Sequence, residues 1–599
     1  MSDDRYPSIG DYGFLADCHS AALVSRSGSI DWCCMPRLDH GPMFGRILDW
    51  DRGGFCRIGP TGDHEVERRY LEGTLVLETT FRTEGGAVRL TDCFVMRPGG
   101  RSDPARQLLR VVDGVEGSVE LEARVVPRFE YGVSLPWIRP YADGQWCALG
   151  GDDGLVISGD LRFEPDDRAD LAAVFTVSEG DRLRVSILYA QPEDIDDGPE
   201  EVVGTDELDR RLQETVDWWR AWAERGSQGV GRGPDAVQRS ALVLKGLTIA
   251  RTGAIAAAAT TSLPEVPGGR QNWDYRYSWV RDSTWAVRAL FELHHDREAD
   301  GFRRFMERTV AGSLDDLNTI YGLGGEHFLS ELELDHLEGY RGARPVRMGN
   351  RAALQQQFDI YGELLELAWE WHERGHEPDE HYWEFLRELA DTAAEVWRRP
   401  DRGIWELRQD PEHYVHSKVM CWAAVDHGLR LAEECGLEAP TERWEKARDE
   451  IREVIEKYGY DEERGVFVRI LFGAELDGAL LLLPRVGFVD YEDDRMVRTV
   501  DAIRKELDHD GLIRRFPTPQ NEGAFLPCSF WLAECLARQG RADEAGDVFE
   551  RACGTANDLG LFSEEYDPDS DEMLGNFPQA LTHLSHISAA LALSGESEF

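Results

Sequence analysis

The sequence predicts a protein of two parts, an antiparallel β-sandwich followed by a ring of paired α-helices. Residues 1 to about 205 contain short segments that alternate or are rich in β-branched residues, separated by Gly, Pro and Asp turns. From about residue 206 onward, apolar residues recur at helical spacing instead. We therefore expect a β-sandwich domain over residues 1–205, a linker helix over 206–232 and a helical domain over 233–599 of this 599-residue chain.

The strand pattern of the first part is clearest in six segments. Their close spacing between turn residues is typical of an antiparallel sandwich. The six expected strands cover residues 21–25, 74–81, 87–95, 119–126, 155–158 and 183–189.

The linker is expected to be a single amphipathic helix from Asp206 to Arg225 that packs on both parts of the protein. Its apolar residues recur at helical spacing and include two tryptophans. These residues are Leu208, Leu212, Val216, Trp219 and Trp222.

Twelve further helices are expected in the second part, with no strands between them. Twelve helices fit a toroid of six helical hairpins, in which inner and outer helices alternate and the connections at one end form a cavity. The absence of a short exact repeat makes a uniform solenoid a weaker interpretation. The expected helices cover residues 235–251, 282–295, 298–312, 351–373, 380–398, 415–435, 441–458, 475–484, 491–508, 524–539, 541–559 and 577–594.

The strongly acidic composition argues against nucleic acids and anionic membranes as partners. The formal net charge is −47, and only five of the 66 basic residues are lysine. A uniformly acidic surface repels nucleic-acid phosphates and anionic membranes, so we expect neither as a partner. At 42% hydrophobic residues the chain is too apolar for a disordered acidic protein. Such a charge predicts a folded protein with a hydrated acidic shell that works in concentrated salt, where screening removes the self-repulsion.

Targeting signals and disulfides are not expected. No apolar run reaches the length of a membrane-spanning helix, and the first residues have no basic region followed by an apolar run. The eleven cysteines are scattered and form no CxxC pair, which predicts reduced thiols and a cytoplasmic protein. We expect most of these cysteines to be small buried apolar residues.

The chemistry is expected in loops of the helical part, first in the segment Gly268-Gly-Arg-Gln-Asn-Trp-Asp-Tyr-Arg-Tyr-Ser-Trp-Val-Arg-Asp282. Four aromatic residues, two arginines and two aspartates fall within ten residues. Aromatic faces stack on sugar rings, and Asp and Arg hold hydroxyl groups by charge-assisted hydrogen bonds. The alternative is a buried aromatic cluster with a structural Arg–Asp pair.

Two further loops carry candidate carboxyl groups. In Gly403-Ile-Trp-Glu406, a turn places Glu406 beside the indole of Trp405, and partial desolvation would raise its pKa toward that of a general acid. In Ser563-Glu-Glu-Tyr566, a loop before the last helix presents Glu564 and Glu565. Two carboxyl loops that face each other across a ring cavity would suit glycoside hydrolysis. The alternative for each glutamate is an ordinary surface acid, because the chain has 113 acidic residues.

Taken together, these motifs resemble glycoside hydrolase family 15, the glucoamylase and trehalase group. Similar motifs occur in order along nearly the whole chain. They are Ile9-Gly-Asp-Tyr-Gly-Phe, Gly28-Ser-Ile-Asp-Trp, Thr260-Thr-Ser-Leu-Pro-Glu, Asn272-Trp-Asp-Tyr-Arg-Tyr-Ser-Trp-Val-Arg-Asp-Ser, Gly403-Ile-Trp-Glu, His416-Ser-Lys-Val-Met-Cys-Trp and Leu574-Gly-Asn-Phe-Pro-Gln-Ala. The resemblance implies an α+β multidomain fold, with an N-terminal super-β-sandwich, a linker and an (α/α)6 barrel.

The resemblance also implies roles for individual residues. Glu406 corresponds to the general acid, and Glu564 to the general base that activates water, with Glu565 the less favoured choice. The remaining matched residues would form the subsite for the non-reducing glucose; these are Arg281, Asp282, Tyr275 and Trp405. Several family members have a second acid after the general acid, whereas this chain has Leu407, so the contacts of the leaving sugar stay open.

The implied activity is inverting hydrolysis of an α-glucoside from its non-reducing end, with release of β-glucose. The segments Ile320–Tyr340 and Ala343–Asn350 look closest to the trehalase branch, so α,α-trehalose is the favoured substrate. A glucoamylase or glucodextranase that acts on short malto- or isomalto-oligosaccharides is the alternative.

Two other classes stay open on the same architecture. A non-catalytic carbohydrate-binding protein is disfavoured because both catalytic positions hold glutamate. A disaccharide phosphorylase needs only one carboxyl group, so the match at Glu564 disfavours it. No cofactor is expected, since no Rossmann or Walker A pattern occurs. No metal site is expected either, because the pairs His413/His416 and His583/His586 lack a third ligand.

Overall fold

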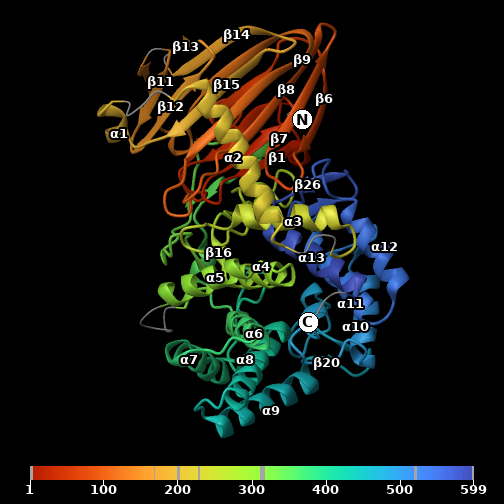
Figure 1. Ribbon diagram of the computed structural model, residues 1–599. Helices are drawn as coiled ribbons and strands as arrows, with labels where there is room; N and C mark the ends of the chain where they lie inside the picture. Colours follow the sequence, from red (N-terminus) through yellow and green to blue (C-terminus); the bar gives the residue numbers. More distant parts are fainter. Residues whose placement is uncertain are drawn as a thin grey trace.

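The computed structural model describes residues 5–142, 144–167, 169–198, 203–226, 230–310, 317–517 and 522–595. A β-rich part forms one end of the molecule and a helical part the other (Figure 1). This arrangement confirms the predicted fold class.

The β-rich part contains fifteen strands among the described residues, all paired in antiparallel ladders. The six expected strands all lie among them, although residues 119–126 are only the second half of one long strand and residues 74–76 precede β7. The strands are β1 (Tyr12–Ala16), β2 (Ala21–Ser25), β3 (Ser29–Cys34), β4 (Pro42–Phe44), β5 (Phe55–Pro60), β6 (Glu65–Tyr70), β7 (Leu77–Thr83), β8 (Gly86–Phe94), β9 (Gln107–Val126), β10 (Trp137–Pro140), β11 (Trp146–Gly150), β12 (Asp153–Gly159), β13 (Glu164–Asp167), β14 (Asp170–Ser178) and β15 (Arg182–Tyr189).

Strand β9 joins the two layers of this part. Its first half pairs with β8 and β15, and its second half pairs with β5 and β14. Gly117 lies where the strand passes from one layer to the other, with φ near +61°. A Cβ atom there would lie 2.3 Å from the carbonyl oxygen of Gly85, so both the conformation and the space favour glycine.

Helix α2 (Thr205–Ala223) connects the two parts and contacts both, as the sequence predicts. On the β-rich side, Asp209 forms ion pairs with Arg182 and Arg184 of β15. On the helical side, the indole of Trp222 donates a hydrogen bond of 3.0 Å to Glu298. A short helix α1 (Pro192–Asp196) lies between β15 and α2 along the chain.

The helical part contains eleven α-helices among the described residues, where twelve were expected. Each lies within or close to a predicted range. They are α3 (Pro234–Leu247), α4 (Val280–Glu292), α5 (Asp296–Thr309), α6 (Asp359–Glu373), α7 (Glu380–Val396), α8 (Val415–Glu434), α9 (Thr441–Tyr458), α10 (Asp494–Glu506), α11 (Leu526–Arg538), α12 (Ala542–Cys553) and α13 (Ala580–Ser594).

The twelfth expected helix, at residues 475–484, is a 3-10 helix of five residues, η6 (Gly478–Leu482). Its apolar run is too short for an α-helix and is followed at once by Pro484. The helix expected over 351–373 is also divided, because a 3-10 turn (Arg351–Leu354) precedes α6. The last residues of the helix expected over 298–312, residues 311 and 312, lie outside the described part.

Five α-helices and one 3-10 helix form a closed inner ring within the helical part. In it α4 packs on α6, α6 on α8, α8 on η6, η6 on α11, α11 on α13, and α13 on α4. The helices of this ring are buried on almost every side, whereas outer helices such as α5, α9 and α10 bury only one face. The 3-10 helix η6 thus takes the place of an inner helix in the toroid.

The expectation of no strands in the helical part was wrong. Short ladders of two or three residues connect the helices, including β16 (Ser278–Trp279) with β17 (Ile320–Tyr321), and β24 (Ala524–Phe525) with β25 (Glu565–Asp567) and β26 (Glu572–Leu574). The remaining ones are β18 (Leu332–Glu333) with β19 (Arg347–Met348), β20 (Tyr460–Asp461) with β21 (Val466–Phe467), and β22 (Asp508–His509) with β23 (Leu512–Ile513). Pairing in these ladders provides hydrogen-bond partners for the backbone groups of the connections.

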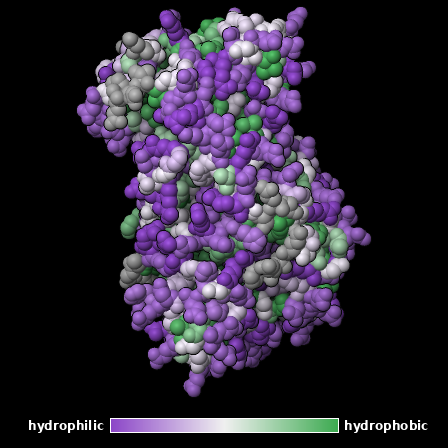
Figure 2. All heavy atoms as spheres, in the orientation of Figure 1, coloured by the Kyte–Doolittle hydropathy of each residue, from purple (hydrophilic) through white to green (hydrophobic). Residues whose placement is uncertain are grey.

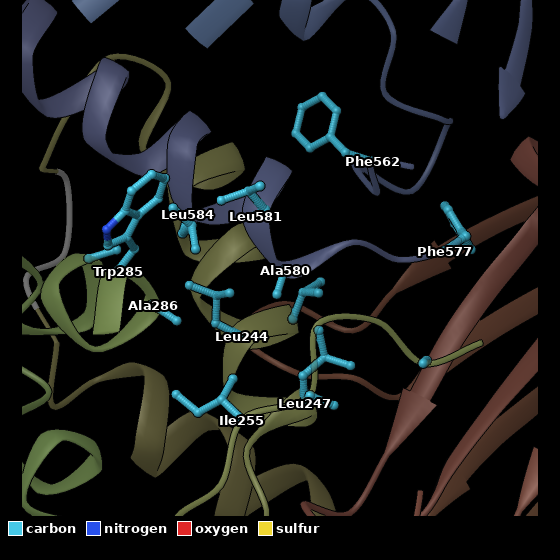
Figure 3. Packing of buried hydrophobic residues seen from close by; sticks show 14 of the residues in the cluster. Leu244, Leu247, Ile255, Trp285, Ala286, Phe562, Phe577, Ala580, Leu581 and Leu584 are labelled. Atoms are coloured by element: carbon cyan, nitrogen blue, oxygen red, sulfur yellow. The ribbon is translucent and has the colours of Figure 1, made fainter. Parts of the chain in front are cut away.

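Apolar packing supports the end of the ring where α3, α4 and α13 meet (Figure 3). Leu244 of α3 lies near Leu581 and Leu584 of α13, with Trp285 of α4 beside them, and Leu247 lies farther along toward Ile255. All six side chains are buried. This packing fixes the starts of α4 and α13, which follow two of the motif loops.

The face of the molecule drawn in Figure 2 is mostly hydrophilic. No helix in the described ranges is long and apolar enough to cross a membrane. All eleven cysteines are unpaired, and nine of them are buried, as expected of small apolar residues.

Candidate functional site

The first motif segment forms one wall of a pocket because its backbone is extended. Its carbonyl groups accept hydrogen bonds from the neighbouring strand-like segment: Ser262 N–H donates to Trp273 at 2.8 Å and Ala258 N–H to Tyr275 at 2.9 Å. Side chains along an extended backbone point alternately to opposite sides. Trp273 and Tyr275 therefore line the pocket, while Asp274 and Arg276 point away from it.

Asp274 and Arg276 form a structural pair that links the two parts of the protein. The guanidinium of Arg276 lies 2.7 Å from Asp274 Oδ2, and both side chains are fully buried. Arg276 also donates hydrogen bonds to the backbone oxygen of His40, at 2.7 Å, and to the hydroxyl of Tyr131. The alternative of a structural Arg–Asp pair is therefore correct for this half of the motif.

Arg281 and Asp282 form a second pair, in the first turn of α4 and at the pocket wall. Arg281 lies 3.5 Å from Asp282, 3.2 Å from Asp359 at the start of α6, and 3.6 Å from Glu406. Burial raises the pKa of Asp282, and the charge of Arg281 opposes that effect. One cation thus pairs with three carboxyl groups, from the first turn of α4, the start of α6 and the loop that carries Glu406.

Glu406 has an unusual backbone conformation, with φ near +56°. A non-glycine residue in this region carries a strain of about 1–3 kcal/mol, and such strain concentrates at functional sites. The indole N–H of Trp279 donates a 2.5 Å hydrogen bond to Glu406 Oε1. Burial raises the pKa of Glu406, while Arg281 and the bond from Trp279 lower it and Asp282 raises it further.

The indole predicted to lie beside Glu406 has a different partner. The N–H group of Trp405 donates a 2.8 Å hydrogen bond to Asp477, and its ring lies against Phe525 and Trp531. Trp405 still lines the pocket, but the indole bonded to Glu406 is Trp279. The side chains of adjacent residues in a turn point in different directions. The position of Trp405 next to Glu406 in the sequence therefore did not predict which indole bonds to Glu406.

Glu564 lies where four of the motif segments meet. Its backbone N–H donates to the carbonyl of Asn576 at 3.2 Å, and Asn576 in turn donates to the carbonyl of Trp273 and accepts from Thr260. The side chain of Glu564 accepts a 3.3 Å hydrogen bond from the Asn576 backbone N–H and another from Tyr275. These bonds fix the carboxyl group against the wall that Tyr275 forms.

The environment of Glu564 favours its protonated form. Burial raises its pKa to about 8, and the nearby carboxyl group of Glu265 raises it too, whereas Arg515, Asn576 and Tyr275 act in the opposite direction. Glu565, the next residue, points elsewhere: it lies 3.0 Å from Arg515 and is absent from the described lining of the pocket.

All six sequence-predicted site residues line one cavity of about 410 Å³. The lining includes Glu406 and Glu564, together with Arg281, Asp282, Tyr275 and Trp405. Leu407 and Arg408 also line it, and the guanidinium of Arg408 lies 4.1 Å from the ring of Trp273. The site therefore combines two carboxyl groups, an Arg–Asp pair and several aromatic surfaces in one concave space.

Sequence reasoning missed several residues at this cavity. Arg515, Glu265 and Glu522 line it as well, and Asp359 contacts Arg281 from behind. Glu265 and Trp279 stand inside the quoted motifs, so a signal for them existed. Arg515 and Glu522 lie in a connection with no distinctive pattern, and only the fold brings them to the pocket.

The histidine pairs have separate surroundings. His583 and His586 both lie within hydrogen-bonding distance of the Ser240 hydroxyl, at 2.9 and 3.0 Å, and the backbone N–H of Phe562 donates to His583. His416 is buried near Asp359, and burial lowers its pKa to about 4. Among the described residues, the clusters of three or more potential metal ligands include none of these four histidines.

Comparisons with known proteins agree along the whole chain. Residues 231–591 match the family described as glycosyl hydrolases family 15, and residues 1–175 match a trehalase-like N-terminal domain. A trehalase of Mycobacterium tuberculosis is 38% identical, over 98% of this chain and 89% of its own length. A trehalase of Thermoplasma volcanium is 35% identical over 98% of this chain and 94% of its own length. A crystal structure of a bacterial glucoamylase complexed with acarbose, 12% identical, has the same fold, with a TM-score of 0.72 over 99% of this chain and 95% of that one.

We predict that Glu564→Gln stabilises the protein at pH 8 but not below about pH 4.5. Between its ordinary pKa of 4.5 and its folded value of about 8, the native protein retains a proton that the unfolded chain has lost. The free energy of unfolding therefore falls as pH rises through this window. A neutral amide at position 564 avoids this loss, which is about 4 kcal/mol at pH 8. Urea denaturation across this pH range measures the difference.

The control is Glu445→Gln, at an exposed position of α9, which should show no pH-dependent gain. A gain for Glu564→Gln that is the same at pH 4 and pH 8 would contradict the raised pKa.

Proposed function

The chain belongs to glycosyl hydrolases family 15, and we propose that within this family of glycoside hydrolases it is an inverting α,α-trehalase. The observation that carries the proposal is the convergence of Glu406, Glu564, Arg281 and Asp282 on one cavity. Relatives named trehalase match almost the entire chain, which supports trehalose as the substrate. The remaining steps assign a role to each group.

Arg281 and Asp282 bind the hydroxyl groups of one glucose unit. Both are buried and charged, and such groups form strong, directional hydrogen bonds with sugars. Tyr275 and Trp405 supply the apolar surface for the ring. A cavity of about 410 Å³ is small for a ligand pocket, which suits a disaccharide better than a polymer chain.

Glu406 acts as the general acid. Burial raises its pKa, which favours the protonated form that a general acid needs, and Trp279 holds its orientation. The proton passes to the glycosidic oxygen as the bond from C1 to that oxygen breaks. The leaving glucose departs with this oxygen, and positive charge develops on the ring that stays bound.

Glu564 acts as the general base. It removes a proton from a water molecule that attacks C1 from the face opposite the leaving oxygen, and the configuration at C1 inverts. The lining favours Glu564 over Glu565, because Glu565 contacts Arg515 instead of the cavity. Tyr275, which donates to Glu564, also helps to hold the base in place.

A glucoamylase or glucodextranase activity on short oligosaccharides is the second candidate. A relative named isomaltose glucohydrolase, from Kribbella flavida, is 24% identical over 51% of this chain. Leu407, at the position where several family members have a second acid, also lines the cavity. A non-catalytic sugar-binding role fits less well, since two buried acids with raised pKa values are costly to maintain for binding alone.

Incubation of the purified protein with trehalose, maltose, isomaltose and soluble starch in concentrated salt tests the substrate. We expect glucose release to be fastest from trehalose and to need no added phosphate as a co-substrate. Faster release of glucose from maltose or isomaltose would contradict the trehalase proposal and support a glucoamylase or glucodextranase. Release of glucose 1-phosphate would indicate a phosphorylase.

Three glutamine substitutions test the catalytic roles. Glu406→Gln and Glu564→Gln should each lower kcat by about 10²–10⁴-fold while substrate binding, measured by calorimetry, stays close to that of the wild type. Glu565→Gln is the matched control and should retain far more turnover than Glu564→Gln. Full activity of Glu406→Gln, or a reversed order of Glu564 and Glu565, would refute the assignment.

A further inference from the structure

Arg515 is a buried cation on which three glutamates converge. Its Nη2 atom lies 2.8 Å from Glu265 Oε2, 3.0 Å from Glu565 Oε1 and in direct contact with Glu522. The three glutamates come from the loop before the first motif segment, from the connection before β24 and from β25. The proposed base, Glu564, directly precedes Glu565 and lines the same cavity as Arg515.

The number of carboxyl groups exceeds the number of cations. Glu265, Glu522, Glu564 and Glu565 are all buried, and Arg515 is the one cation within 4.0 Å of any of them among the described residues. Four ionised carboxylates around one guanidinium would leave three uncompensated buried charges, which is prohibitive. The cluster therefore holds protons in the resting protein.

A buried carboxyl oxygen without a hydrogen-bond partner also indicates that not all four carboxyl groups are ionised. Glu565 Oε2 is buried and accepts no hydrogen bond from the described part of the chain, and burial raises the pKa of Glu565. An ionised oxygen in that position would be strongly unfavourable, whereas a protonated carboxyl group tolerates it better. The guanidinium itself is shielded by aromatic rings, because it lies 5.1 Å from the ring of Phe525 and 6.0 Å from that of Trp405.

A general base must be ionised when the water molecule attacks, although burial favours the opposite state for Glu564. Hydrogen bonds from Asn576 and Tyr275 help the ionised form. Of the charged groups, Arg515 favours it and Glu265 disfavours it. In this poorly solvated space each charge acts more strongly than it would in water.

We propose that Arg515 is a positioning residue for the catalytic base, opposed by Glu265, so that the balance between these two groups sets the ionisation of Glu564. The inference rests on the proposed function, because it takes Glu564 as the base. Arg515 does not contact the reacting atoms in this account. Its positive charge favours the ionised form of Glu564, and its ion pairs hold Glu265, Glu522 and Glu565 nearby.

Other titratable groups face the cluster without supplying a competing cation. Tyr275 interacts with both Glu564 and Glu406. Asp477 accepts the hydrogen bond of Trp405, and Cys528 is close enough to Arg515 to feel its charge. Burial raises the pKa of each, so Tyr275 and Cys528 stay neutral near neutral pH. Asp477 is paired with Arg469 at 3.4 Å.

Opposite substitutions test this balance through the pH profile of kcat/KM, whose acidic limb reports the base of the free enzyme. Arg515→Met should move that limb to higher pH by about one to two units, since the base loses its favourable charge. Glu265→Gln should move it to lower pH, since a neighbouring carboxyl group is removed. The substrate is whichever α-glucoside the wild type hydrolyses fastest.

Matched variants separate positioning from general structure. Arg515→Lys keeps the charge and should restore the limb most of the way toward the wild-type position. Arg288→Met removes another buried arginine that pairs with two glutamates, Glu366 and Glu370, and should leave the limb unchanged. Circular dichroism of each variant checks that it is folded.

Limbs that stay in place in both Arg515→Met and Glu265→Gln, or that move in the same direction, would overturn the inference. If Arg515→Met does not fold, the direction of the shift in Glu265→Gln decides alone. Failure of the proposed function is recognised separately, because Glu564→Gln would then keep its turnover whatever the limb does.

Discussion

Burial of several carboxyl groups with too few cations is the constraint on which the site depends. At one wall of the cavity, Arg281 forms ion pairs with Asp282, Asp359 and Glu406. At another wall, Arg515 forms ion pairs with Glu265, Glu522 and Glu565. Because neither guanidinium can neutralise all its neighbours, protons must stay on some of the carboxyl groups at neutral pH. The pKa values of the proposed acid, Glu406, and of the proposed base, Glu564, are both raised in this environment, and acid–base hydrolysis requires one protonated and one ionised carboxyl group.

The β-rich part helps to position one wall of the pocket in the helical part. The buried pair Asp274–Arg276 is anchored to the backbone of His40 and the hydroxyl of Tyr131, both from the first part of the chain. Because side chains alternate along this extended segment, fixing Asp274 and Arg276 on one side fixes Trp273 and Tyr275 on the other. Trp32 of β3 adds a hydrogen bond of 2.8 Å to the backbone of Ala259 in the neighbouring segment. The β-rich part therefore sets the position of the pocket wall that contacts Glu564.

Much of this could be predicted from the sequence, because periodicity and ordered motifs report local structure well. Eleven of the twelve helix ranges lie where the periodicity predicts them, and the six residues indicated by the family motifs line one cavity. What the patterns missed depends on contacts between distant segments. The indole that bonds Glu406 is Trp279, 127 residues away, and not the adjacent Trp405. Arg515 meets Glu265 across 250 residues, and the fourth inner helix is a 3-10 turn because its apolar run ends at Pro484. The expected salt dependence, which follows from the net charge of −47, stays a prediction.

The central claim is that Glu406 and Glu564 act from opposite faces of the bound glucose, and the anomeric form of the first product tests it most directly. Proton magnetic resonance, recorded during the first minutes of trehalose hydrolysis, distinguishes α- from β-glucose before the two interconvert. Inversion at the attacked carbon gives β-glucose, while the leaving glucose keeps its α configuration, so the account predicts the two anomers in equal initial amounts. Initial formation of α-glucose alone would mean retention and would contradict it.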